Sequence, residues 1–234
     1  MCAALDGRVS SLLASMNAAG IAKSVVCSIA TQPKQFRSIL DWSRSIRSER
    51  IIPFPSFHPE SPRALDEIAE IHREGFKSIK LHPYYQDFFL DEKRLLPIFA
   101  WIADLGLILV MHTGFDIGFL QELGADPAKI ASLMRQFPEL KFIATHLGSW
   151  QQWQEVHEEL VGTDVYFDIA FSLEFLPKEI ARKIILSHAP DRVLFGSDSP
   201  WAAQQNTIDL LQSIDLGQER EQQILGENAA RLLQ

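Results

Sequence analysis

The sequence predicts an α/β protein built on a parallel sheet, and three observations favour this fold class. Helical and strand-like segments alternate along the 234 residues with short connections. The strand-like segments are continuous apolar runs, as expected when both faces of a sheet are covered. Several runs end in His or Asp, and a parallel sheet would bring these ends to one edge. We therefore expect a single domain over residues 1–234, with its chemistry at the carboxyl ends of the strands.

The first part of the chain is expected to open with a helix at 8–19. Its apolar residues follow a helical spacing, and Gly20 is a typical residue just past a helix end. Pro53 and Pro55 are unfavourable in a central strand, because proline cannot donate to a neighbouring strand. The elements expected next are a strand at 24–30, a helix at 35–47, a strand at 51–57, a helix at 62–74 and a strand at 78–81.

The second part continues the alternation. Pro127 lies in the first turn of a predicted helix, where its missing N–H has no cost. The expected helices are 91–105, 127–137, 151–161, 177–187, 206–214 and 218–233, and the expected strands are 107–111, 141–145, 164–169 and 192–196. No Gly-x-Gly-x-x-Gly turn follows the first strand, which argues against a dinucleotide-binding sheet. With the earlier three, the strands number seven, whereas a closed (β/α) barrel needs eight.

Composition limits the function classes. The formal net charge of −8 argues against nucleic acid as the main partner, since phosphate binding needs clustered Lys and Arg. No apolar run approaches the ~20 residues of a membrane helix, and the first residues do not resemble a signal peptide. Two Cys make neither a disulfide framework nor a metal spacing, and Cys27 is expected to be a buried free thiol. These features favour a cytoplasmic protein.

The candidate functional residues follow the apolar runs. Asp198 follows the run 193–196 after one residue, Ser197, at the end of a predicted buried strand, where a carboxylate is costly unless something charged pairs with it. It could instead only cap the following helix. Four other runs end in a histidine, at His58, His82, His112 and His146. One such histidine is commonly a core residue, but four histidines and an aspartate in equivalent positions are hard to explain by packing.

Four of these segments resemble the amidohydrolase superfamily, in the same order along the chain. They are Ile79–Lys80–Leu81–His82–Pro83, Met111–His112–Thr113–Gly114, Ala144–Thr145–His146–Leu147–Gly148 and Leu194–Phe195–Gly196–Ser197–Asp198–Ser199–Pro200. The closest branch is the amidohydrolase-2 group, which includes aminocarboxymuconate-semialdehyde decarboxylase and related decarboxylases and hydrolases. The closing segment 224–233 also resembles that family's last helix. The resemblance covers the chain from about Ala19 to its end.

The resemblance implies a TIM-type (β/α)8 barrel with a divalent metal at its C-terminal mouth. The metal is expected to be zinc, with manganese or magnesium as alternatives. By analogy with the family, His112 and Asp198 would be metal ligands, and His146 could supply the third ligand that a catalytic zinc needs. Asp198 and His146 would also be catalytic, handling the proton of the metal-bound water. Lys80, His82 and Trp201 are expected to contact the substrate; a packing role for Trp201 remains an alternative.

One departure from the family pattern is important. The family's first strand carries a His-x-His pair that binds the metal, yet this chain has no His before His58. The strand that is missing from the count of eight is therefore the same one that should carry the His-x-His pair. Either the first strand precedes Met1, or the protein has lost that strand and its metal. We expect an incomplete barrel with seven recognisable strands.

The leading hypothesis is a metal-dependent hydrolase or non-oxidative decarboxylase. Its substrate would be a small organic acid, lactone or amide, attacked or protonated through a metal-bound water. The alternative is a non-catalytic barrel, without metal, that binds a ligand or a second chain. Without a first strand, the edges at 24–30 and 192–196 keep unpaired backbone groups, and exposed edges invite pairing. A homodimer is therefore a further expectation.

Overall fold

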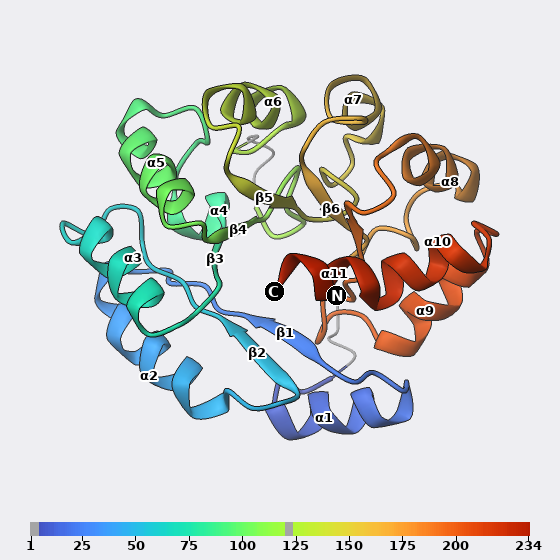
Figure 1. Cartoon of the computed structure of the whole chain (residues 1–234), viewed down its shortest axis with the longest axis horizontal. Helices are drawn as coiled ribbons and strands as arrows, with labels where there is room; N and C mark the ends of the chain where they lie inside the picture. The colour runs from blue at the N-terminus through green and yellow to red at the C-terminus, as the bar shows by residue number, and fades with distance from the viewer. Residues whose placement is uncertain (1–4, 120–123) are drawn as a thin grey trace.

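The computed structural model describes residues 5–119 and 124–234, and helices and strands alternate there as the sequence predicts (Figure 1). The strands are β1 (Ser24–Cys27), β2 (Ile51–Phe54), β3 (Ser78–Leu81), β4 (Ile108–Met111), β5 (Lys141–Ala144), β6 (Tyr166–Asp168) and β7 (Val193–Leu194). The main helices are α1 (Val9–Ala18), α2 (Phe36–Ile46), α3 (Ala64–Arg73), α5 (Leu96–Asp104), α6 (Pro127–Gln136), α7 (Trp153–Glu159), α8 (Lys178–Ser187) and α9 (Gln204–Gln212).

The remaining elements are short or belong to the last helix. Single turns occur at η1 (Pro33–Gln35), α4 (Pro83–Gln86) and η2 (Lys93–Leu95). The last helix runs from α10 (Gln218–Gln222) through the π-turn η3 (Gln223–Glu227) into α11 (Asn228–Leu232). Among the described residues, no helix has both the length and the apolar character needed to cross a membrane.

All strand pairs are parallel, and the strands follow one another in chain order. The pairing divides into β1–β2 and β3–β4–β5–β6–β7. The division falls at the prolines of β2. Phe54 O accepts from Ser28 of the β1 side, so Pro53 and Pro55 face β3 without an N–H to donate. Pro55 still accepts a hydrogen bond from Lys80 N at 2.9 Å, which joins the two parts.

The outer edge of β1 is open. Ser24 N donates to Arg50 O and Ser28 N to Phe54 O, both toward β2. Because backbone groups alternate sides along a strand, those of Val25 and Cys27 point away from β2. No strand pairs with that side in the described part of the chain. The incomplete barrel with seven strands is therefore confirmed. The expectation of a buried Cys27 is wrong, because the thiol lies on this open edge and is exposed.

The other end of the sheet is covered by the C-terminal helix. Phe195 N, just after β7, donates to Ile224 O at 2.9 Å. The amide of Asn228 donates to Val193 O and Pro190 O, both at 2.8 Å. The π-turn and α11 therefore satisfy the backbone groups at the β7 edge, and Figure 1 shows this helix crossing near the centre of the molecule. Between β1 and β7, the backbone groups on the β7 side therefore have hydrogen-bond partners. Among the described residues, those on the outer side of β1 have none.

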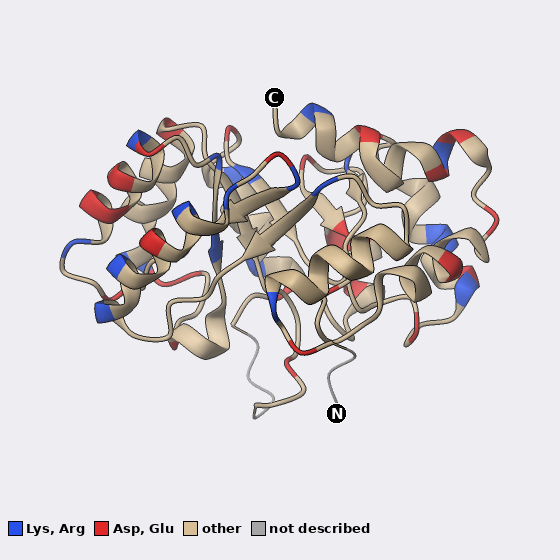
Figure 2. Cartoon of the chain, turned by 90° about the horizontal axis from the view of Figure 1, so that it is seen from below, with Lys and Arg blue, Asp and Glu red and all other residues tan. Residues whose placement is uncertain are grey.

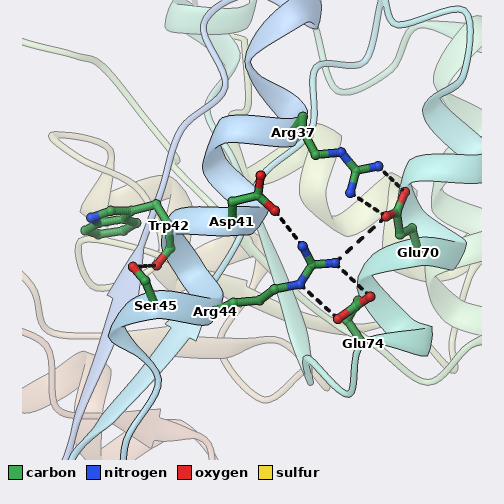
Figure 3. A network of polar contacts seen from close by, with 7 residues as sticks. All are labelled: Arg37, Asp41, Trp42, Arg44, Ser45, Glu70 and Glu74. Atoms are coloured by element: carbon green, nitrogen blue, oxygen red, sulfur yellow. Dashed lines mark hydrogen bonds and ion pairs between the residues drawn. The ribbon is translucent and has the colours of Figure 1, made fainter.

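An ion-pair network joins α2 to α3 on the outside of the β1–β2 unit (Figure 3). The guanidinium of Arg37 donates to both oxygens of Glu70, at 2.8 and 3.1 Å. Arg44 lies 2.7 Å from Glu74 and also reaches Asp41. The hydrogen bond from Arg44 lowers the pKa of Glu74. These groups are partly exposed, so the network contributes modestly to stability, but it fixes α2 relative to α3.

The apolar core lies mostly between the strands and the outer helices, which carry the charged residues (Figure 2). A smaller cluster inside the ring of strands comprises Phe54, Ile108, Val110, Ile143 and Leu194. This inner cluster borders a cavity of about 1400 Å³ that reaches the carboxyl ends of the strands. The interior of a complete barrel is filled by side chains. Here the described residues supply seven strands, and the interior is open.

Candidate active site

The structure brings all six sequence-predicted site residues to the wall of one cavity. They are Lys80, His82, His112, His146, Asp198 and Trp201. Lys80 and the three histidines are at most 8% exposed, whereas Trp201 is 49% exposed and Asp198 is also exposed. The cavity therefore has a buried side, formed by the ends of β3, β4 and β5, and an open side beyond β7.

His146 has a partner at every polar atom. Its Nδ1 lies 2.9 Å from Ala170 O, and because a carbonyl only accepts, Nδ1 carries a proton. Its Nε2 lies 3.1 Å from Nδ1 of His112. Its backbone N–H donates to Asp168 Oδ1 at 3.0 Å, and its carbonyl accepts from Trp153 Nε1. The residue has a positive φ of 61°, a conformation that these four contacts hold in place.

This hydrogen-bond chain determines the tautomer of His112. In neutral His146 the proton is on Nδ1, so Nε2 accepts and His112 Nδ1 must donate. Burial, followed by the nearby His146, His82 and Lys80, lowers the pKa of His112 well below its usual value, so its ring is neutral at pH 7. His112 Nε2 therefore carries a bare lone pair. It is buried and has no hydrogen-bond partner in the described part of the chain.

His82 lies directly against His112. The ring centroids are 4.1 Å apart and the planes differ by 10°. His82 Nε2 is 3.4 Å from Oδ2 of Asp116, and the same oxygen is 3.8 Å from His112 Nε2. Burial lowers the pKa of His82 to about 4, partly opposed by the hydrogen bond to Asp116. Both stacked rings are therefore neutral at pH 7, the form in which imidazole binds metal.

Asp116 is a functional candidate that the sequence prediction missed. It lies on the loop after β4, four residues beyond His112, and its Oδ1 accepts from Gly118 N at 2.7 Å. Burial raises the pKa of this carboxyl, but the hydrogen bonds from His82 and Gly118 hold it below its usual value. His82, His112 and Asp116 each offer one ligand atom within 4.8 Å of the others. The spacing His112-x-x-x-Asp116 is a weak signal that could have drawn attention to it.

Gly114 allows the loop to turn back over His112. Its φ is +84°, and a Cβ there would lie 2.1 Å from Trp150 N and 2.4 Å from Trp150 O. The backbone of Gly114 forms a parallel bridge with Trp150, and Phe115 N donates to Trp150 O at 3.2 Å. Only glycine permits this close approach together with a positive φ. The turn therefore places Asp116 Oδ2 3.8 Å from Nε2 of His112.

Gln86, also absent from the sequence prediction, holds the backbone of His82 through a hydrogen bond. It is fully buried, and its Oε1 accepts from His82 N at 2.8 Å. Its amide donates to Phe57 O at 2.7 Å and to Ala30 O at 2.9 Å. One side chain thus ties together the segments that follow β1, β2 and β3.

Lys80 is a buried lysine in the same cavity wall as the three histidines. It is 8% exposed, and its ammonium has no hydrogen-bond or ion-pair partner among the residues that the structure describes. Asp168, at the end of β6, lines the same cavity. Burial raises the pKa of this carboxyl, although His146 and Lys80 oppose the effect. No sequence feature distinguished Asp168, because it lies within an expected strand.

The family model described as amidohydrolase matches residues 10–234. The chain belongs to the amidohydrolase family. A search of curated proteins finds no match.

Solved structures share the amidohydrolase fold at low sequence identity. An uncharacterised TIM-barrel protein from Bordetella bronchiseptica has a TM-score of 0.75 and 21% identity, over 97% of this chain and 82% of that chain. The 5-carboxyvanillate decarboxylase of Sphingomonas paucimobilis has a TM-score of 0.75 and 15% identity, over 97% and 83%. That of Novosphingobium aromaticivorans, solved with manganese, has a TM-score of 0.73 and 17% identity, over 95% and 79%. These likenesses confirm the predicted TIM-type fold.

The residues of this amidohydrolase fit a divalent cation on chemical grounds. His112 Nε2 is a buried lone pair with no partner in the described residues, and the Asp116 carboxylate lies beside it. Neutral imidazole together with carboxylate suits zinc, manganese and related ions. His146, a sequence-predicted ligand, has both ring nitrogens engaged as the structure stands. Asp198 lines the cavity but does not belong to the group formed by His82, His112 and Asp116.

Proposed function

We propose that the chain is a metal-dependent hydrolase or non-oxidative decarboxylase of a small organic acid, lactone or amide. The observation that carries the proposal is the bare Nε2 of His112, which the contact with His146 directs into the cavity. Membership of the amidohydrolase family supports it, as do the decarboxylases among the structural neighbours. We propose zinc or manganese as the cation, with magnesium as an alternative.

A bound divalent cation would act as a Lewis acid and lower the pKa of a bound water to ~7. His112 would hold this cation, and His146 would act through His112 by fixing its tautomer. Asp198, exposed on the open side of the cavity, would take or return the proton of the reacting group. Asp168 would hold the backbone of His146 in position.

We propose that Lys80 binds the anionic group of the substrate. A buried ammonium without a partner favours a complementary anion. Trp201, at the open side of the cavity, and His82, at its buried side, would contact the rest of the molecule. A small molecule suits the cavity, and we propose neither nucleic acid nor a membrane as partner. A cytoplasmic location remains part of the proposal.

The metal is tested first. Metal content is measured by elemental mass spectrometry on the wild type, on His112→Ala and on His72→Ala, an exposed helical histidine that serves as control. We expect about one divalent cation per chain in the wild type and the control, and loss in His112→Ala. A wild type without affinity for zinc, manganese or magnesium would refute the proposal.

The reaction is tested next on the metal-loaded protein. A panel of carboxylated phenols is followed by carbon dioxide release, and a panel of lactones and amides by acid release. We expect turnover in one of the two panels, and its loss after treatment with a chelator. Activity that survives complete removal of the metal would contradict the proposed mechanism.

A second function is favoured by the open edge of β1. The backbone groups of Val25 and Cys27, which no other described residue pairs, border an apolar cavity, an arrangement that suits pairing with a second copy of the chain. In this alternative the barrel is non-catalytic and forms a homodimer. Light scattering after size exclusion would compare the wild type with Val25→Pro, which removes an N–H from the open side, and with Val25→Thr. A monomeric wild type would exclude this alternative.

A further inference from the structure

The carboxylate nearest to the paired histidines is not the one that the sequence indicated. Asp198 lies on the exposed side of the cavity, outside the group formed by His82, His112 and Asp116. Asp116 Oδ2 lies 3.4 Å from His82 Nε2 and 3.8 Å from His112 Nε2. The loop after β4, rather than the end of β7, thus brings a negative charge to these rings.

The distance between Asp116 Oδ2 and His112 Nε2 is slightly longer than that between two ligand atoms on one ion. A distance of 3.8 Å between Oδ2 and His112 Nε2 exceeds hydrogen-bond range. Moreover, this Nε2 has no proton to donate, because the proton of the ring is on Nδ1. Two atoms that each bind one ion at about 2.0–2.2 Å in tetrahedral geometry lie about 3.4 Å apart. A cation between Oδ2 and Nε2 would therefore need only a small movement of the side chains.

The loop leaves one carboxylate oxygen available for a ligand. Oδ1 of Asp116 is engaged by Gly118 N at 2.7 Å, which fixes the side chain and directs Oδ2 toward the rings. The turn at Gly114, held against Trp150, sets the position of the loop. The carboxylate of Asp116 is half-buried, with its side chain 17% exposed, so its interaction with a cation is only weakly screened by solvent.

We propose that Asp116 is the carboxylate ligand of the divalent cation, binding through Oδ2 beside Nε2 of His112. The inference rests on the proposed function in one respect, namely that a cation binds at this cavity. It differs from the family-based expectation, in which Asp198 supplies the carboxylate. His82 Nε2 provides the third ligand atom once the proton that it shares with Asp116 has moved to Nδ1 of the same ring.

A cation can bind both His82 and His112 only if their stacked rings change orientation. An imidazole binds a cation in the plane of its own ring, and the planes of His82 and His112 are only 10° from parallel. One ring must therefore turn when the cation binds. His146 holds His112 by its Nδ1, whereas His82 Nδ1 has no partner in the described residues, so His82 is the ring that turns.

The test compares three carboxylate-to-amide variants. Asp116→Asn keeps an oxygen that can accept from Gly118 N, so the loop is preserved while the charge is lost. Asp198→Asn removes the rival carboxylate of the same cavity. Asp66→Asn, with its side chain 72% exposed on α3, is the control. Zinc affinity is measured by calorimetry on chelator-treated protein, and the absorption spectrum of the cobalt-loaded protein reports the ligand set.

We expect Asp116→Asn to weaken zinc binding by more than about 100-fold, since even loss of an outer partner costs 10–100-fold. Its cobalt spectrum should change, while Asp66→Asn matches the wild type. Loss of zinc in both Asp116→Asn and Asp198→Asn, with unaltered circular dichroism, still supports Asp116 as a ligand. If Asp116→Asn binds zinc like the wild type, the inference is wrong although the proposed function stands. If the wild type binds no metal, both fail.

Discussion

His112 Nδ1 and His146 Nε2 lie 3.1 Å apart, and this contact determines which nitrogen of His112 faces the cavity. The direction of the bond follows from Ala170 O, a pure acceptor 2.9 Å from the other nitrogen of His146. A backbone carbonyl after β6 thus controls, through one side chain, the lone pair at the end of β4. The relationship explains why two histidines on neighbouring strands are needed to present one ligand atom.

Replacing His146 should therefore weaken metal binding without removing a ligand. In His146→Phe the ring of His112 loses its acceptor and can adopt either tautomer. We expect zinc affinity to fall by about 10–100-fold, the usual effect of losing a partner of a ligand. Calorimetry on chelator-treated protein measures it, and His72→Phe on the surface of α3 is the control. Complete loss of zinc would instead indicate that His146 is itself a ligand.

Gln86 should be important for stability. In Gln86→Leu, two buried backbone groups, His82 N and Ala30 O, lose their partners, and Phe57 O keeps only its contact with Ser56 Oγ at 3.3 Å. Each unsatisfied group costs about 1–3 kcal/mol, so we expect the free energy of unfolding to fall by at least about 2 kcal/mol in urea titrations. Gln136→Leu, on an exposed helical site, should change it by less than about 0.5 kcal/mol. A small effect of Gln86→Leu would show that water replaces the amide.

The order of strands and the shared cavity could be predicted from sequence, because a polar residue after an apolar run is a local signal. Asp116 could not be predicted in this way. It reaches His82 and His112 only because Gly114 turns the chain against Trp150, a contact between residues far apart in sequence. Gln86 and Asp168 act through backbone groups of other segments, which also leave no pattern in the sequence.

At Cys27 a local sequence pattern predicted the wrong environment. Its apolar neighbours predict burial, which holds for a strand with partners on both sides, but within residues 5–119 and 124–234 β1 has a partner on one side only. The thiol is exposed to the cavity, yet the surrounding protein raises its pKa to about 11 by desolvation. The two observations agree if the side chain faces an enclosed space, and the thiol is then a poor nucleophile at neutral pH.

The turn at Gly114 gives a further prediction. In Gly114→Ala the new Cβ would overlap the backbone of Trp150, and the φ of +84° is unfavourable for alanine. We expect a loss of at least about 3 kcal/mol in the free energy of unfolding, or a displaced loop with weaker zinc binding. Gly226→Ala is the matched control, because nothing lies within 4 Å of its Cβ position. That variant should be neutral or more stable by up to about 1 kcal/mol. Equal effects of the two substitutions would contradict the account of the turn.

His188 should make stability depend on pH, away from the active site. Its ring is buried against Phe167, at 4.1 Å between centroids. Nδ1 accepts from Gly162 N at 3.1 Å, and Nε2 lies 2.8 Å from Val165 O. The neutral tautomer is thus fully satisfied, whereas a second proton would face the N–H of Gly162. Burial is the main cause that lowers the pKa of His188, partly opposed by the hydrogen bond to Val165.

The direction of the effect follows from proton uptake. Below the unfolded pKa of about 6.5, the unfolded chain binds a proton that the folded His188 rejects. The free energy of unfolding should therefore decrease as the pH falls from 7 toward 5, and His82 and His112 act in the same direction. Urea titrations across this range should show a shallower dependence in His188→Phe, even though that variant is less stable at pH 7. His72→Phe should keep the wild-type slope, and an unchanged slope in His188→Phe would mean that this ring is protonated in the folded protein.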